Sequence, residues 1–414
     1  MGGLLRVATA GSVDDGKSTL LGRLLHDSKA VFADQLSAVT DASLRRGYTE
    51  TDLALLVDGL RAEREQGITI DVAYRYFSTP RRSFILADTP GHVQYTRNMV
   101  TGASTADVAV VLVDVRAGLV DQSRRHAAIA ALLGVRHLVL AVNKMDLMGF
   151  AEDAYDQICG DFAELADRRG IPSWAAIPMS ALHGDNVVTR SERTSWYAGP
   201  ALLEHLETLA LPEPRAVGTR FPVQLVIRPR TAAHPDYRGY AGRVAAGTLR
   251  VGQALTVLPR GQRTELAGID TADGPLTQVG AGRSVVLRLA DHVDVARGDL
   301  LAADPLPVPA KQVEAVVCWL ADTPLRAGDH YRVRHTTRDV PAVVTDVHDR
   351  LDVSTLDTAT ATELVLNDVG RVTVRTSEPV VAEPYADCRA TGALLLVDGH
   401  TGATMAAGMV RDVR

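Results

Sequence analysis

Lysine is nearly absent from this chain of 414 residues, although lysine and arginine together number 44. The lysines are Lys17, Lys29, Lys144 and Lys311. A compact ammonium on a flexible stem and a planar guanidinium do different work, so the two residue types are not interchangeable at specific sites. Lys17 and Lys144 both lie in segments, described below, where an ammonium has a role that arginine does not replace.

Cysteine is also scarce, and long apolar runs are missing. Cys159, Cys318 and Cys388 lie far apart and lack metal-ligand spacing, as is typical of core thiols in a reducing cytoplasm. No run of about 18 apolar residues exists, so we expect no membrane span and no signal peptide. The net charge of −6 argues against a general nucleic-acid or membrane surface. The length and the 46% apolar content suggest roughly two to four domains.

A glycine-rich segment near the start of the chain predicts a phosphate-binding loop. Residues 11–19 fit the pattern of two glycines followed by lysine and serine. Residues 4–10 predict a buried strand before the loop, and leucines at helical spacing in 20–25 predict a helix after it; these flanks disfavour a chance glycine turn. Backbone N–H groups and the helix N-terminus would hold a phosphate chain, with Lys17 at the β- and γ-phosphates and the Ser18 hydroxyl on Mg²⁺. The loop residues are Gly11, Ser12, Val13, Asp14, Asp15, Gly16, Lys17, Ser18 and Thr19.

The segment Asp88-Thr-Pro-Gly-His follows the apolar stretch 84–88. A carboxylate at the C-terminal end of a strand is well placed to assist a bound Mg²⁺, and the Gly91 amide could meet a γ-phosphate. A plain β-turn is the alternative. The position of this segment behind a phosphate loop favours the nucleotide role.

A threonine is expected between these two segments, to close on Mg²⁺ and the γ-phosphate and to let go after hydrolysis. Thr69, in the sequence Gly67-Ile-Thr-Ile70, is the candidate. The alternative is that Thr69 merely begins the strand 70–74.

Guanine is predicted as the base by Asn143-Lys-Met-Asp146, which follows the apolar stretch 138–142. The Asp146 carboxylate can accept from both N1–H and the N2 amine of guanine, and adenine has neither donor. The Lys144 stem is expected to lie against the base, and Asn143 to tie this loop to the phosphate loop. Backbone N–H groups of Ser180, Ala181 and Leu182 would reach guanine O6. The stretch 108–115 predicts a further buried strand, apolar except for Asp114.

In this order, the segments resemble those of translation-factor-type GTPases, the group that contains elongation factor Tu. Within that group the chain is more similar to one branch, the large GTPase subunit of bacterial sulfate adenylyltransferase. One mark of that branch is Asp15, where elongation factors usually have histidine. The stretches that carry the resemblance over essentially the whole chain are 13–19, 25–29, 34–36, 94–105, 121–126, 221–224, 236–242, 297–300 and 401–410.

The resemblance implies roles for individual residues. It places His92 where the family orients the attacking water, with Val13 and Ile68 as the apolar pair that gates it, and it suggests that Asp14 holds a monovalent cation or braces the loop. Lys17 and Thr69 complete the expected catalytic set. The positions matched to GTP and Mg²⁺ are Lys17, Ser18, Thr69, Asp88, Gly91, Asn143, Lys144 and Asp146.

The α/β pattern ends near residues 200–211, and short alternating strands with glycine turns follow from Arg220. We expect an α/β P-loop GTPase domain, with a mostly parallel sheet and helices on both faces, followed by two small antiparallel β-barrels. Neither barrel has a recognisable catalytic cluster, and arginines scattered among acids favour solvated strand faces over nucleic-acid binding. The expected domains are 1–212, 215–305 and 308–414.

The resemblance implies an enzyme in the cytoplasm whose GTP hydrolysis drives ATP and sulfate to adenosine 5′-phosphosulfate and pyrophosphate, the first step of sulfate assimilation. Adenylyl transfer would take place on a separate small catalytic subunit in a heterodimer. Gly16-Lys17 has no second copy, so we expect no fused adenylylsulfate kinase.

Two alternatives share the GTP motifs. An elongation factor-like GTPase that delivers charged tRNA is disfavoured by Asp15, by the sequence 94–97 and by the acidic balance. A non-catalytic regulatory switch is disfavoured by His92.

Overall fold

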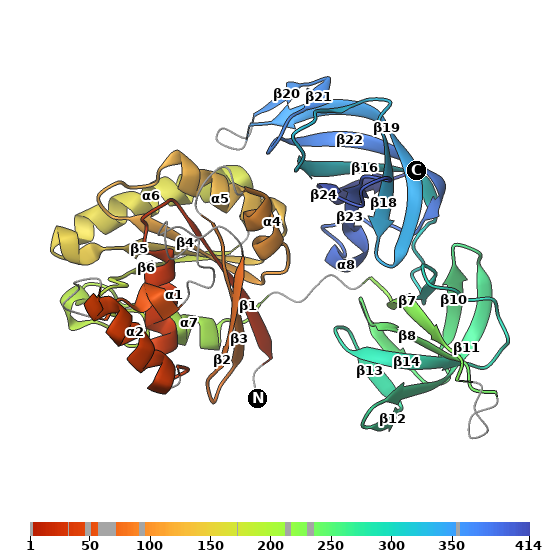
Figure 1. The fold of residues 1–414 in the computed structure, drawn as a ribbon, viewed down its shortest axis with the longest axis horizontal. Helices are drawn as coiled ribbons and strands as arrows, with labels where there is room; N and C mark the ends of the chain where they lie inside the picture. Colours follow the sequence, from red (N-terminus) through yellow and green to blue (C-terminus); the bar gives the residue numbers. More distant parts are fainter. Residues whose placement is uncertain are drawn as a thin grey trace. The chain divides into compact units, whose positions relative to one another are not determined.

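The computed structural model describes residues 3–31, 33–45, 51–56, 72–90, 96–171, 173–211, 217–229, 236–352 and 357–414. The chain divides into two compact units, Met1–Pro212 and Glu213–Arg414 (Figure 1). Within the described ranges, no helix combines the length and the apolar character that crossing a membrane requires.

The first unit is built on a six-stranded sheet with the strand order β2-β3-β1-β4-β5-β6. All neighbouring strands are parallel except β2, which pairs antiparallel with β3. The strands are β1 (Leu4–Gly11), β2 (Ala73–Ser78), β3 (Ser83–Asp88), β4 (Val108–Asp114), β5 (His137–Asn143) and β6 (Trp174–Pro178). The helices are α1 (Lys17–Asp27), α2 (Ala33–Arg45), α4 (Thr96–Ser104), α5 (Asp121–Leu132), α6 (Glu152–Arg169) and α7 (Leu202–Thr208), with 3₁₀ turns at Leu53–Leu56, Met145–Met148 and Glu192–Thr194.

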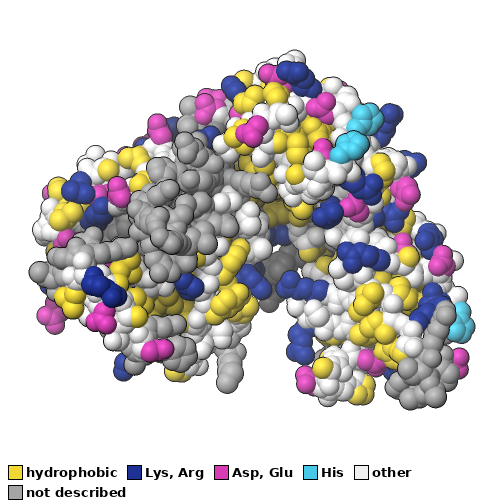
Figure 2. All heavy atoms as spheres, viewed as in Figure 1, with side chains coloured by type: hydrophobic (Ala, Val, Ile, Leu, Met, Phe, Trp, Pro, Cys, Tyr) yellow, Lys and Arg dark blue, Asp and Glu magenta, His cyan; other side chains and the backbone are white. Residues whose placement is uncertain are grey.

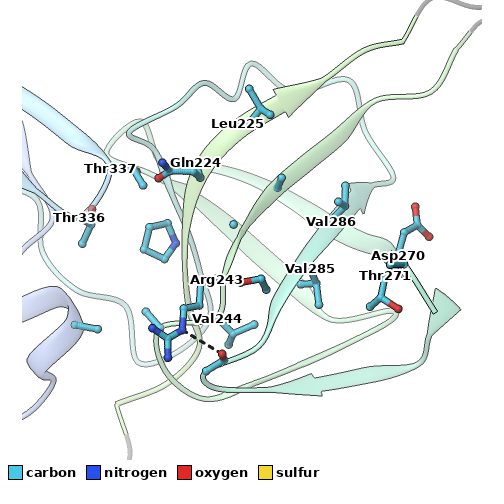
Figure 3. A pocket seen from close by; sticks show the side chains of 18 of the residues that line it. Gln224, Leu225, Arg243, Val244, Asp270, Thr271, Val285, Val286, Thr336 and Thr337 are labelled. Atoms are coloured by element: carbon cyan, nitrogen blue, oxygen red, sulfur yellow. Dashed lines mark hydrogen bonds between the residues drawn. The ribbon is translucent and has the colours of Figure 1, made fainter. Parts of the chain in front are cut away.

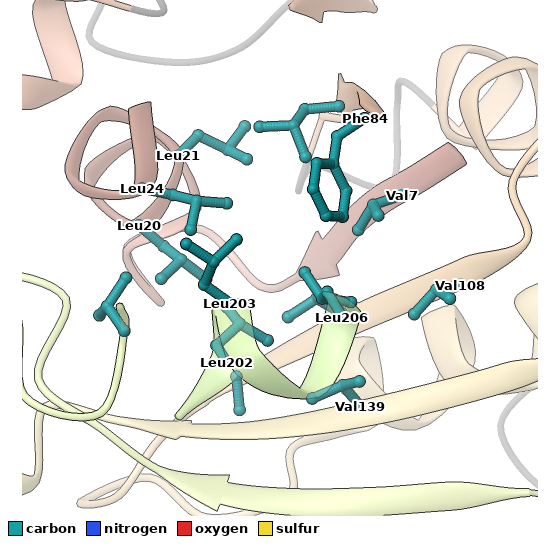
Figure 4. Packing of buried hydrophobic residues seen from close by; sticks show 14 of the residues in the cluster. Val7, Leu20, Leu21, Leu24, Phe84, Val108, Val139, Leu202, Leu203 and Leu206 are labelled. Atoms are coloured by element: carbon teal, nitrogen blue, oxygen red, sulfur yellow. The ribbon is translucent and has the colours of Figure 1, made fainter. Parts of the chain in front are cut away.

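Helices cover both faces of this sheet, which explains why every residue of β4 and β5 is buried. On one face, leucines of α1 and α7 pack against alternate residues of the strands (Figure 4). The residues between those positions face α5 and α6. The predicted α/β P-loop architecture is therefore confirmed. Because the strands are parallel, the loops after β1, β4, β5 and β6 all emerge at the same edge.

The first barrel of the second unit closes in the order β10-β15-β7-β8-β14-β11 and back to β10, with every pair antiparallel. Its strands are β7 (Arg220–Ile227), β8 (Gly239–Arg243), β10 (Ala254–Leu258), β11 (Gln262–Thr271), β14 (Ser284–Leu289) and β15 (Leu300–Ala302). The short strands β9 (Thr248–Arg250) and β13 (Gln278–Gly280) pair with each other, and β12 (Gly274–Leu276) pairs with β11.

The second barrel closes in the order β18-β23-β24-β16-β22-β19 and back to β18. Its strands are β16 (Ala310–Trp319), β18 (His330–His335), β19 (Arg338–Leu351), β22 (Val369–Val380), β23 (Ala393–Val397) and β24 (Thr404–Val413). Smaller elements are β17 (Leu325–Arg326), β20 (Thr358–Thr360), β21 (Glu363–Leu364) and α8 (Arg389–Gly392). The two predicted antiparallel barrels are thus confirmed, while the boundaries 215–305 and 308–414 stay a prediction.

Charges of both signs are mixed on the surface of the second unit. On the face shown in Figure 2, its basic side chains are interspersed with acidic and hydrophobic ones. Several of its arginines are paired with neighbouring carboxylates, as in Arg371 with Asp349 and Arg326 with Glu363. This arrangement fits solvated strand faces.

A cavity of about 1060 Å³ lies beside β7, β8 and β14 in the second unit (Figure 3). Several of its polar side chains are hydrogen-bonded within the protein. Arg243 donates to the Gly282 carbonyl, and the Asp270 carboxylate accepts from the Tyr237 hydroxyl and from Arg288.

A buried ion pair connects the two barrels of the second unit. Arg220, at the start of β7, is 1% exposed, and its Nε and Nη2 donate to the two carboxylate oxygens of Glu383 at 2.9 and 2.8 Å. Its Nη1 donates to the carbonyl of Ala303, and the Thr391 hydroxyl donates to Glu383. Since both charges are buried and hydrogen-bonded, removing one would leave the other without compensation.

We expect Glu383→Gln to destabilise the second unit by about 3–5 kcal/mol, because a buried Arg220 cation would lose its counter-charge. The matched control is Glu363→Gln, whose partner Arg326 is 64% exposed. That variant should cost no more than about 1 kcal/mol. Denaturant unfolding of the full chain, followed by circular dichroism, measures both. Equal losses in the two variants would contradict the role assigned to the buried pair.

Candidate nucleotide site

The loop between β1 and α1 has the backbone geometry of an anion site. Gly16 precedes α1 with φ of 95°, a left-handed conformation that favours glycine. A Cβ at this position would lie 2.5 Å from the Asn143 side-chain nitrogen. Helix α1 carries no side-chain cap and no acidic residue in its first turn. Its N–H groups and dipole therefore suit an incoming phosphate.

Lys17 lies inside this loop. Its Nζ donates to the carbonyl of Gly11 at 3.1 Å and to that of Ser12 at 2.6 Å. Burial lowers the pKa of Lys17, while the nearby carboxylates of Asp88, Asp15 and Asp14 oppose that shift. The ammonium is thus held by neutral oxygens, which a phosphate oxygen can replace with a stronger charge-assisted bond.

Asp15, which marks the resemblance, braces the same loop. Its Oδ2 accepts from the Ser12 backbone N–H at 2.6 Å. Burial raises the pKa of Asp15, and the hydrogen bond from Ser12 counteracts this shift. Its neighbour Asp14 has a left-handed backbone with φ of 65°. Asp15 thus stabilises the conformation of the phosphate loop through its hydrogen bond with Ser12.

Hydroxyls and a carboxylate meet where β1, β3 and α1 converge. Asp88, at the end of β3, is buried and accepts from Thr9 at 3.0 Å and from Ser18 at 3.3 Å. The Thr89 hydroxyl donates to the Thr9 carbonyl. Hydroxyl and carboxylate oxygens are the ligands that Mg²⁺ prefers. Ser18 and Asp88, both predicted to serve a bound Mg²⁺, are thus in contact, and their oxygens fit this ion.

Asn143 connects the phosphate loop to the loop after β6. Its Nδ2 donates to the carbonyl of Asp15 at 2.7 Å, and its Oδ1 accepts from the Ala181 N–H at 2.9 Å. The contact predicted between Asn143 and the phosphate loop is present. Ser180 and Ala181 are buried and Leu182 is exposed. Asp146 lies in the 3₁₀ turn after β5, with His183 Nε2 3.8 Å from its carboxylate.

Two contacts of this site were missed by the sequence analysis. The guanidinium of Arg23, on α1, donates through Nε to the Ala181 carbonyl at 3.3 Å and through Nη2 to that of Leu182. On α5, the buried His126 accepts through Nδ1 from the Gly11 N–H at 3.0 Å. No signal in the sequence points to Arg23. His126, in contrast, stands among the apolar residues of the helix 121–132, and a histidine in such a place indicates a buried polar contact.

The pKa of His126 is lowered to about 3, chiefly by burial and further by the Lys17 and Arg125 cations. The ring is therefore neutral near pH 7. Because Nδ1 accepts from the Gly11 N–H, the proton of the neutral ring is on Nε2. The phosphate loop is thus supported by a neutral imidazole.

Thr69, Gly91 and His92, together with Ile68, lie outside the described residues. Their roles stay predictions. The other predicted site residues are described, and β1, β3, β5 and β6 bring them to the same edge of the sheet.

The fold and the loop define a P-loop nucleotide-binding domain. Residues 3–212 match the elongation factor Tu GTP binding domain, so this unit binds GTP, and residues 312–411 match the GTP-eEF1A C-terminal domain-like family.

Curated relatives extend the similarity to the whole chain. The chain is 55% identical to the bifunctional enzyme CysN/CysC of Mycobacterium tuberculosis, over 99% of this chain and 68% of that protein. It is 49% identical to sulfate adenylyltransferase subunit 1 of Laribacter hongkongensis, over 99% of this chain and 85% of the relative. It is 46% identical to sulfate adenylyltransferase subunit 1 of Alteromonas mediterranea, over 99% of this chain and 87% of the relative. The chain belongs to the sulfate adenylyltransferase subunit 1 family, as a GTPase subunit of the elongation factor Tu-like type.

We expect the stability of the first unit to fall as pH decreases from about 6.5 towards 3. In this window the unfolded chain takes up a proton at His126, whose ordinary pKa is 6.5, while the folded chain, with its pKa at about 3, does not. Unfolding therefore gains protons, and acid favours it. Thermal unfolding of the full chain, followed by circular dichroism between pH 4 and 8, measures the slope.

His126→Gln should flatten this pH dependence, whereas His292→Gln, at an exposed position, should leave it unchanged. A slope in His126→Gln that matches wild type would contradict the assignment.

Proposed function

We propose that this chain is the GTPase subunit of a sulfate adenylyltransferase, and that its GTP hydrolysis drives the formation of adenosine 5′-phosphosulfate and pyrophosphate from ATP and sulfate. The observation that carries the proposal is the similarity to sulfate adenylyltransferase subunit 1 proteins over 99% of the chain, barrels included. A GTP-binding domain by itself would leave the coupled reaction open.

The phosphate end of the site supports phosphoryl transfer to water. On binding GTP, Lys17 exchanges the carbonyls of Gly11 and Ser12 for β- and γ-phosphate oxygens, and the N–H groups of residues 11–19 close around the phosphates. Ser18, Thr69 and Asp88 are the residues proposed to hold Mg²⁺, which neutralises phosphate charge when bound.

His92 is proposed to place the water that attacks the γ-phosphorus. The bond from that phosphorus to the β-phosphate oxygen breaks, and GDP and inorganic phosphate leave. Thr69 would contact the γ-phosphate and release it afterwards, and the Gly91 amide would meet the same group. Charge stabilisation and positioning are the main sources of rate in such reactions.

The base end of the site supports guanine. Asp146 would accept from N1–H and the N2 amine, with Lys144 against the base. Asn143 holds the loop of Ser180, Ala181 and Leu182, whose backbone N–H groups would meet guanine O6. Adenine would leave the Asp146 carboxylate unpaired, which explains the expected selectivity.

Coupling to GTP answers a thermodynamic difficulty. Sulfate is a weak nucleophile and the mixed anhydride product is high in free energy, so the adenylyl transfer by itself lies towards ATP. We place that transfer on a separate small catalytic subunit, which binds ATP and sulfate. We propose a complex in the cytoplasm that involves neither nucleic acid nor membrane.

Asp146→Asn should weaken GTP binding by about 100-fold or more and should admit xanthosine triphosphate, because the amide can donate to the oxygen that xanthine carries at position 2. Asp156→Asn, the same change at an exposed position on α6, is the matched control and should bind GTP as wild type does. Competition titrations with a fluorescent guanine nucleotide measure both. An unchanged nucleotide preference in Asp146→Asn would remove that residue from base recognition.

The proposed function is tested by sulfate-dependent pyrophosphate release from ATP, measured on the full chain copurified with its partner, with and without GTP. We expect release to require the partner and to increase with GTP. His92→Ala should keep GTP binding and lose the increase, because it removes the group that places water.

No pyrophosphate release from a complex with a verified functional partner and intact GTP hydrolysis would overturn the proposal. It would favour the elongation factor-like alternative.

A further inference from the structure

Asp114 is a buried carboxylate at the end of the otherwise apolar strand β4, and it is 7% exposed. Its Oδ2 lies 3.0 Å from Lys144 Nζ. Its two oxygens also accept from Arg116, through Nε at 3.0 Å and Nη2 at 2.6 Å, and Oδ1 accepts from the Arg116 backbone N–H at 3.0 Å. One buried carboxylate thus holds two cations.

The sheet register puts this carboxylate beside the predicted guanine loop. Asp114 on β4 is paired with Asn143 on β5, and Lys144 follows directly. Lys144 has a left-handed backbone with φ of 61°, a conformation that is unfavourable for a residue with a Cβ. Its ion pair with Asp114 offsets part of this cost and fixes the direction of the side chain.

The charges around the pair explain why a dedicated partner is useful. The Lys144 cation opposes the burial that raises the pKa of Asp15, and it also helps to lower the pKa of Asp114, so this ammonium interacts with more than one carboxylate. The hydrogen bond from Arg116 is the largest cause that holds the pKa of Asp114 well below its usual range. Asp114 is therefore ionised near neutral pH and keeps its ion pair with the Lys144 ammonium.

We propose, resting on the function proposed above, that Asp114 is a positioning residue of the guanine site. It holds the ammonium of Lys144 so that the aliphatic stem lies across the face of the base, and Arg116 keeps the carboxylate in place. The contact is with the face of the base and not with its edge. It therefore acts alike on GTP and GDP and does not discriminate guanine from xanthine.

We expect Asp114→Asn to raise the dissociation constants of GTP and GDP by about tenfold each and to raise KM for GTP with kcat unchanged. Lys144→Met should have a similar effect. The double variant should bind the nucleotides no more weakly than the single variant with the lower affinity, since both changes remove the same contact. The preference for GTP over xanthosine triphosphate should stay as in wild type, unlike in Asp146→Asn.

The matched control is Asp107→Asn, next to the opposite end of β4. Asp107 pairs with Arg136 at 2.5 Å and accepts from the Arg6 N–H at 3.1 Å, and it is remote from the nucleotide edge. It should leave nucleotide binding unchanged even if the thermal midpoint falls.

Wild-type affinity in Asp114→Asn, additive losses in the double variant, or an equal loss in Asp107→Asn would each overturn the proposal. Wild-type protein that does not prefer GTP over ATP would instead overturn the proposed function, so the two failures are distinguishable.

Discussion

The two hydrogen bonds of the Asn143 side chain hold the nucleotide site together. The buried amide donates to the carbonyl of Asp15 and accepts from the N–H of Ala181, so loops from β1, β5 and β6 share one polar group. Such a group can lie in the interior only with its hydrogen bonds made. The shape of the phosphate loop and the position of the base loop are therefore linked, and the glycine at position 16 leaves room for that link.

The two lysines of the site have different partners: one is ion-paired with a carboxylate, and the other is bound only to carbonyl oxygens that a phosphate can replace. Lys144 is paired with Asp114 through an ionic contact. Lys17 is held by the carbonyls of Gly11 and Ser12, which are neutral and can be replaced by phosphate. This difference explains why lysine stands at positions 17 and 144. A planar guanidinium with five fixed donors would not fit inside the loop as the single ammonium does.

The second unit is built from two closed antiparallel barrels. Closing each barrel removes the free strand edges that would otherwise pair with other chains. The buried ion pair of Arg220 and Glu383 connects the two barrels with two charge-assisted hydrogen bonds, and each partner is held in its own barrel by a further hydrogen bond, Arg220 to the Ala303 carbonyl and Glu383 from the Thr391 hydroxyl. Several of its surface arginines pair with neighbouring carboxylates, as Arg371 does with Asp349 and Arg326 with Glu363.

The sequence by itself determined the P-loop domain, the pattern of antiparallel barrels and the described nucleotide motifs, because each depends on contiguous residues whose backbone chemistry is local. The glycines of 11–16, the Asn143-Asp146 segment and the alternating strands are of this kind. The tertiary structure decided the contact of His126 with Gly11, 115 residues apart, the ion pair of Arg220 with Glu383, 163 apart, and the pairing of Asp114 with Lys144. These partners are chosen by strand register and helix packing, which bring distant residues together and leave no periodic trace in the sequence.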